Sequence, residues 1–166
     1  MTSSAQWLES LTANLIAQNY TIKNSESYDG VTYSLAAHRG RFEITKFGYA
    51  EYFYLVSELH NPTLEQVKQA CAKSFTYGYI HRKLQIPAGI ISSCFVFQIL
   101  LVDHVSTEIA EYITSTIPPK HWAKMEFPVV IDLSSDKVYV CEKTPLWGAA
   151  YFGGFRKQAK AMLGIS

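Results

Sequence analysis

The stretch from Ile90 to Val102 constrains the fold more than any other part of the chain. Apart from Ser92, Ser93 and Gln98, every residue in it is apolar. A strand without alternating polar and apolar residues must be covered on both faces. Even when extended back to Pro87, the stretch falls short of the roughly 18–20 apolar residues that cross a bilayer. It therefore predicts a central, fully buried strand.

Helices are expected on both sides of this strand in the sequence. Ser3 and Gln6 match a capping box, and apolar residues at helical spacing follow over residues 4–18. Thr63 and Gln66 match a second capping box. Two more helices are predicted, one starting at Val105-Ser106 and one from about Gly154 to Leu163.

Strands are predicted from alternating residues between the first two helices and near the end. Residues 20–59 read as an antiparallel meander with turns at Asp29-Gly30 and Arg39-Gly40, and residues 128–142 read as a hairpin. We therefore expect residues 1–166 to form a single α+β domain. Its sheet is mixed and mostly antiparallel, with helices packed on it in the order α-β-β-β(-β)-α-β-α-β-β-α.

Composition excludes several classes of protein. Fifteen Lys and Arg against 14 Asp and Glu leave a net charge of +1, which excludes histone-like and acidic-tail proteins. Cys71, Cys94 and Cys141 lie far apart, which favours reduced thiols over a disulfide framework. Met1–Ser10 lacks a secretory pattern. We expect a soluble, cytoplasmic protein without a membrane partner.

No catalytic motif is present in the sequence. The five histidines are widely separated, and neither H-E-x-x-H nor a zinc-type cysteine pair occurs, so no metal or cofactor is predicted. G-x-S-x-G and the phosphate-binding glycine loops are also missing. Enzymatic activity therefore stays open, and a non-catalytic role is favoured.

The segment from Thr144 to Lys157 is rich in aromatic and glycine residues, and it is the first candidate for ligand or partner binding. If Gly153 and Gly154 precede a helix, their N–H groups and the cations after them could hold an anion. Alternatively, the aromatics fill the core. The candidate residues in this segment are Trp147, Gly148, Tyr151, Gly153, Gly154, Arg156 and Lys157.

Two further segments concentrate aromatic residues. Tyr52 and Tyr54 share one face of the Phe47–Tyr54 segment, which is either a covered strand or an exposed face that docks a partner. Pro118–Trp122 is predicted to be a stiff loop ending in an aromatic residue, which either contacts a partner or closes over the sheet.

The order helix, three strands, helix and strand over residues 4–102 is similar to the core of the restriction-endonuclease-like nucleases. That resemblance implies an acidic residue on one strand and E-x-K or D-x-K on the next, which together hold Mg²⁺. Here Lys46 comes one residue too late after Glu43, and Glu142-Lys143 after Asp132 are adjacent. Since strand side chains alternate, the catalytic set is degenerate or displaced.

Two functions follow as hypotheses. The favoured one is a binding or interaction module with a protein partner, possibly a homo-oligomer that self-associates through aromatic surfaces. The alternative is a nucleic-acid-binding or nucleic-acid-processing protein on the nuclease-like scaffold. It predicts that the basic pairs Arg39/Arg41, Arg82/Lys83 and Arg156/Lys157 converge near Glu43 or Asp132.

Overall fold

The predicted central strand is confirmed in the computed structural model, which describes residues 2–44, 48–86, 91–119, 121–144 and 149–165. Strand β6 (Ser92–Val102) has 11 residues, and every one of them is buried. It pairs in parallel with β5 (Gly48–Leu59) on one side and with β7 (Lys124–Asp132) on the other. The apolar run therefore lies in the middle of the sheet, covered from both faces.

The main sheet has six strands in the order β1-β4-β5-β6-β7-β8. The outer strands β1 (Thr21–Lys23), β4 (Leu35–Glu43) and β8 (Lys137–Val140) pair antiparallel with their neighbours. A separate hairpin consists of β2 (Glu26–Tyr28) and β3 (Val31–Tyr33). The mixed, mostly antiparallel sheet confirms the predicted α+β class and element order.

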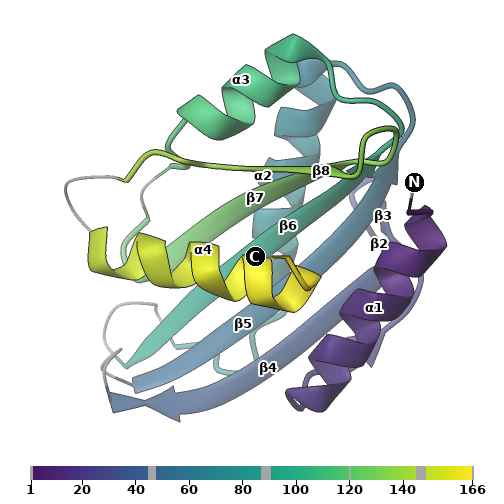
Figure 1. Ribbon diagram of the computed structural model, residues 1–166. Coiled ribbons are helices and arrows are strands. Elements are labelled where there is room, and N and C mark those ends of the chain that lie inside the picture. The colour runs from purple at the N-terminus through teal and green to yellow at the C-terminus, as the bar shows by residue number, and fades with distance from the viewer. Residues whose placement is uncertain (1, 45–47, 87–90, 120, 145–148, 166) are drawn as a thin grey trace.

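Helices cover both faces of the sheet (Figure 1). Helices α1 (Ser4–Ala17) and α4 (Ala149–Leu163) pack on what we call the front face, and α2 (Leu64–Ile80) and α3 (Thr107–Ser115) pack on the back face. Both predicted capping boxes are present, at Ser3 with Gln6 and at Thr63 with Gln66. The local polar signals therefore define where two of the helices begin.

Aromatic side chains fill the front layer of the core. The rings of Tyr54 and Phe97 are stacked, with centroids 4.4 Å apart and planes within 6° of each other. Phe155 of α4 lies tilted against Phe97, with a centroid distance of 6.0 Å. Much of the aromatic content of the chain is thus used in burying the sheet.

Three local predictions are wrong. Arg39-Gly40 is not a turn but the middle of β4, where the Tyr49 ring lies so close that a Cβ on Gly40 would be 2.1 Å from its hydroxyl oxygen. The meander is interrupted because β2 and β3 form their own sheet. Helix α4 starts at Ala149, so Gly153-Gly154 lie inside it rather than before it. In addition, no helix in the described part of the chain is long and apolar enough to cross a membrane.

The three cysteines are expected to react slowly in the native protein. All three are free and buried, and burial raises the pKa of Cys71 and of Cys94 to about 12. Because the thiolate is the reacting species, a colourimetric disulfide reagent at pH 8 should modify them only as fast as the chain opens. In urea all three should react at once. A native thiol that reacts at the denatured rate would contradict this placement.

Candidate functional site

One end of the sheet carries several exposed hydrophobic side chains. Strand β4 ends there, and β5, β6 and β7 begin there, because Phe42 pairs with Tyr49, Tyr49 with Ser92, and Cys94 with Lys124. We call the four large side chains at this place the hydrophobic end; they are Phe42 (73% exposed), Ile44 (82%), Ile91 (49%) and Trp122 (80%). Large apolar side chains gathered on one surface are typical of interaction sites.

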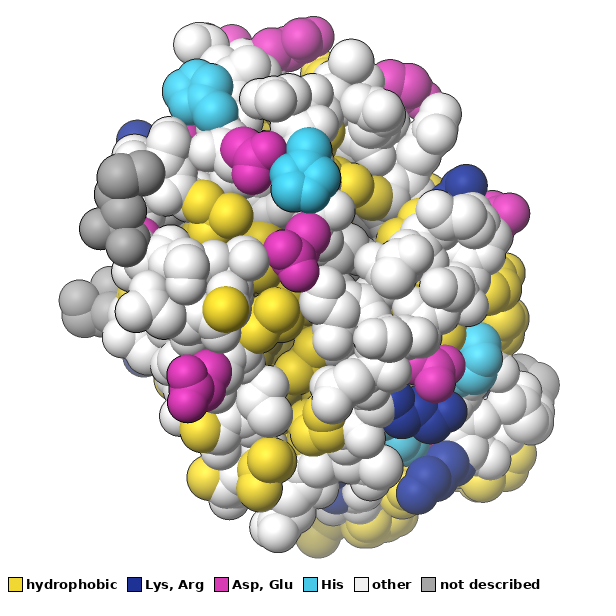
Figure 2. All heavy atoms as spheres, turned by 90° about the vertical axis from the view of Figure 1, so that its right-hand side faces the viewer, with side chains coloured by type: hydrophobic (Ala, Val, Ile, Leu, Met, Phe, Trp, Pro, Cys, Tyr) yellow, Lys and Arg dark blue, Asp and Glu magenta, His cyan; other side chains and the backbone are white. Residues whose placement is uncertain are grey.

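In Figure 1 this end lies at the lower left. Figure 2 is viewed from the right-hand side of Figure 1, so most of this end is turned away from the viewer there. The view keeps the vertical direction of Figure 1, in which β4 stops and β5 and β6 begin at the bottom. On the side that Figure 2 does show, Lys and Arg side chains lie next to hydrophobic ones at the lower right. Asp, Glu and His side chains are spread over this face, and several of them lie in its upper part.

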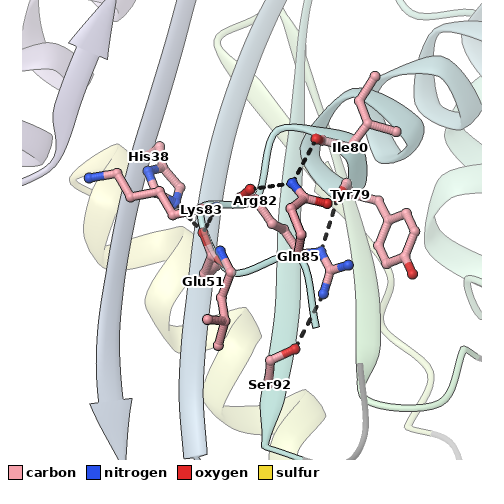
Figure 3. Close-up of polar contacts among 9 residues, drawn as sticks. His38, Glu51, Tyr79, Ile80, Arg82, Lys83, Gln85 and Ser92 are labelled. Carbon is pink, nitrogen blue, oxygen red and sulfur yellow. Dashed lines mark hydrogen bonds and ion pairs between the residues drawn. The ribbon is translucent and has the colours of Figure 1, made fainter. Parts of the chain in front are cut away.

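A buried carboxylate fixes the chain next to the hydrophobic end (Figure 3). Glu51 on β5 has no exposed surface, and it accepts hydrogen bonds from the backbone N–H groups of Lys83 (2.8 Å) and Leu84 (3.0 Å). His38 on β4 contacts the same carboxylate through Nε2 at 2.7 Å. These contacts attach the segment that follows α2 to the middle of the sheet.

Electrostatics favour the charged form of this carboxylate. Burial alone would raise the pKa of Glu51, but hydrogen bonds from His38 and from the backbone of Leu84 and Lys83 hold it below the usual value. A charged group without exposed surface is stable only when it is paired and fully hydrogen-bonded. Glu51 therefore acts as an anchor for this segment.

A second anchor is the guanidinium of Arg82. It donates from Nε to the carbonyl of Tyr79 (3.0 Å), and from Nη1 to the carbonyl of Ile86 (3.1 Å) and to Ser92 Oγ (3.3 Å). Only 5% of the residue is exposed. Arg82 thus joins the end of α2 to the start of β6, and its charge is used inside the molecule.

The predicted nucleic-acid contacts do not come together. Arg39 and Arg41 lie on the front face, over the rings of Tyr20 and Tyr52 respectively. Arg82 and Lys83 follow α2 on the back face. Arg41 pairs with Glu43, and Arg39 donates to the backbone carbonyl of Gln18, the residue after α1, at 2.6 Å. The expected convergence near Glu43 is therefore wrong, because residues 39 and 83 belong to opposite sides of one sheet.

The aromatic and glycine segment is placed only in part. Trp147 and Gly148 lie outside the described residues, as does Lys46 of the nuclease-like pattern. Tyr151, Gly153 and Gly154 belong to α4, so the glycines do not offer free N–H groups at a helix start. Arg156 donates to the carbonyls of Cys141 and Lys143, whereas Lys157 is exposed.

Tyr52 and Tyr54 have no exposed surface. Tyr52 stacks on Phe95 and donates its hydroxyl to Glu43 Oε1 at 2.7 Å. The prediction that these tyrosines dock a partner is not supported by their placement, since both are core residues of the front layer. Strand β5 is instead the covered strand that the sequence left as the alternative.

A polar cluster lies at the opposite end of the sheet, where β6 and β7 finish. Asp132 accepts hydrogen bonds from the N–H and Oγ of Ser134 (2.8 and 2.6 Å), and His104 Nδ1 lies 3.3 Å from the same Oγ. Burial would raise the pKa of Asp132, but hydrogen bonds from Ser134 and the backbone of Val105 hold it below the usual value. The Ser134 hydroxyl points to the carboxylate, so this arrangement closes the turn between β7 and β8.

Neither a metal centre nor a relative identifies the site. Among the described residues, no group of three or more His, Cys, Asp or Glu side chains could hold a metal ion. No known protein family, curated protein or solved structure matches this chain. The hydrophobic end is therefore the candidate site on the strength of its own geometry. Of the four residues of the hydrophobic end, the sequence indicates only Trp122 as a candidate, as part of the Pro118–Trp122 loop.

Replacing Glu51 by Gln should destabilise the protein in a pH-dependent way. We expect the free energy of unfolding at neutral pH to fall by about 1–3 kcal/mol, the usual cost when a buried charged hydrogen-bond partner is lost. The folded pKa of Glu51 is lowered, so its contribution is present above the ordinary value of 4.5 and is lost as the pH falls below it.

Urea unfolding at several pH values measures this effect. The difference between Glu51→Gln and the wild type should narrow as the pH falls from about 5 to about 3. Glu111→Gln, exposed on α3 and beyond its first turn, is the matched control and should change the free energy by less than about 0.5 kcal/mol. A difference that stays constant with pH would contradict the anchoring role of the charge.

Proposed function

We propose that this protein is an interaction module that binds a protein partner through the hydrophobic end. The observation that carries this proposal is the gathering of Phe42, Ile44, Ile91 and Trp122 at one end of the sheet, each about half exposed or more. Full burial of one such side chain contributes about 1.5–3 kcal/mol, so covering the four together is a strong driving force for association.

The anchors beside the hydrophobic end favour binding. Glu51 and Arg82 hold residues 82–84 against β5 and β6, close to where Ile91 precedes β6. A surface that is already ordered loses less conformational entropy when a partner binds. These contacts thus fix residues 82–84 in place beside the hydrophobic end.

The charges at this end favour a protein over a nucleic acid. Arg82 is buried, Arg41 is paired with Glu43, and the ammonium of Lys124 lies over the Tyr79 ring at 4.2 Å. Phosphate binding needs cations that are directed outward along a groove. Exposed Trp, Phe and Ile beside these three cations, each of which already has a partner, match the apolar centre of a protein interface better.

Site-specific photo-crosslinking in the cell of origin tests this proposal. A photoreactive phenylalanine analogue at Trp122 should give discrete protein adducts, and the same analogue at the exposed Glu108 should not. Adducts that nuclease removes, or equal adducts at both positions, would contradict the proposal.

The same adducts should depend on the neighbouring apolar side chains. With the analogue at Ile44, the double variant Ile91→Ser/Trp122→Ser should lower the adduct yield at least about tenfold, since two buried apolar anchors are lost. Because both side chains are exposed, thermal unfolding should show little change. An unchanged yield in a stably folded variant would overturn the role of the hydrophobic end.

A further inference from the structure

The outer edge of β4 is open where it reaches the hydrophobic end. Strand β1 pairs only with Ala36–His38 of β4. Its first residue, Thr21, lies opposite His38, so the pairing with β1 does not extend beyond His38. Within the described residues, the strand pairing of Arg41 and Phe42 is with β5 alone. An open strand edge of this kind is a template for another strand.

We propose that a second copy of this chain pairs with this edge, β4 against β4, around a two-fold axis at Phe42. This inference rests on the proposed function in that Phe42 and Ile44 belong to the hydrophobic end. A two-fold axis perpendicular to the sheet makes the strands antiparallel and keeps the front faces on the same side. The two sheets then continue as one.

The side chains of β4 complement each other in this register. Arg41 of one copy lies directly opposite Glu43 of the other, and the reverse pair forms on the other side of the axis. Both side chains are on the front face, because Arg41 lies over the Tyr52 ring and Glu43 accepts from the Tyr52 hydroxyl. Opposite charges directly across an antiparallel pair stabilise it, whereas like charges destabilise it.

The back face contributes an aromatic pair. Phe42, which is 73% exposed in one copy, meets Phe42 of the second copy at the axis, and cross-strand aromatic pairs are among the more stabilising ones. On the same face, the Tyr49 ring already covers Gly40, where a Cβ would lie 2.1 Å from the Tyr49 hydroxyl oxygen. The pairing therefore covers Phe42, the large exposed hydrophobic residue of β4.

Overall charge does not oppose this association. The chain carries a net charge of +1, so two copies repel each other weakly. At the same time, the Arg41 and Glu43 pattern disfavours strands that lack the complementary order of charges. The edge thus favours its own copy over an unrelated strand, which is the usual way in which charged edges gain specificity.

Cysteine crosslinking tests the register. Residues directly opposite each other in an antiparallel pair have Cα atoms about 4.5–5.5 Å apart, within disulfide range. Phe42→Cys should therefore form a disulfide-linked dimer under mild oxidation. Ile44→Cys is the matched control, as exposed as Phe42 but roughly 14 Å from its copy in this register. The three native cysteines are buried and should stay reduced.

Charge reversal tests the same register without a crosslink. Arg41→Glu alone and Glu43→Arg alone each place like charges opposite each other at both positions, and each should weaken the dimer about tenfold or more by sedimentation equilibrium. An equimolar mixture of the two variants restores opposite charges at both positions. It should form heterodimers with nearly wild-type affinity, detected by energy transfer between labelled copies. Lys157→Glu, which makes the same change of charge on α4, should leave the dimer unchanged.

The outcomes separate this inference from the proposed function. A wild-type chain that stays monomeric at about 100 µM, or that crosslinks equally through positions 42 and 44, overturns the β4 pairing. The pairing is also overturned if the mixed heterodimer associates no more tightly than the homodimer of either single variant. Photo-adducts of other proteins at position 122 can still form in these cases, and their loss is the separate result that overturns the proposed function.

Discussion

The rest of the structure depends on the complete burial of β6. A strand with eleven buried residues needs apolar cover on both faces, so helices α1 and α4 must lie on the front and α2 and α3 on the back. Parallel neighbours joined by helices are the usual way to achieve this. As a result β5, β6 and β7 all begin at the same end of the sheet, and this is where the exposed hydrophobic side chains gather.

Buried polar residues support this arrangement by tying connections to the sheet. Glu51 and Arg82 hold the segment after α2, and Gln98 on β6 donates from Nε2 to the carbonyl of Cys71 (2.9 Å) and to Glu126 Oε2 (3.2 Å). Each of these groups is costly to bury unless it is hydrogen-bonded. Their common role is structural, and it leaves the surface chemistry of the candidate site to apolar side chains and to the open edge of β4.

The aromatic residues divide between the two roles. Tyr52, Tyr54 and Phe97 are stacked inside the front layer, where they stabilise the sheet. Phe42, near the end of β4, and Trp122, in the turn before β7, lie at the hydrophobic end and remain exposed there. The proposed interface and the proposed β4 pairing both use this second group, and covering it removes most of its contact with water.

The central strand and the starts of α1 and α2 could be predicted from local signals in the sequence, namely an unbroken apolar run and two capping boxes. The sequence did not determine which side chains reach the surface. Arg39-Gly40 has the composition of a turn, yet β5 pairs along it and Tyr49 packs on the glycine. Likewise only the tertiary structure decided that Arg82 is an internal anchor, that Tyr52 is core, and that Phe42 lies at an open edge. These properties depend on strand pairing between distant segments, which no local pattern encodes.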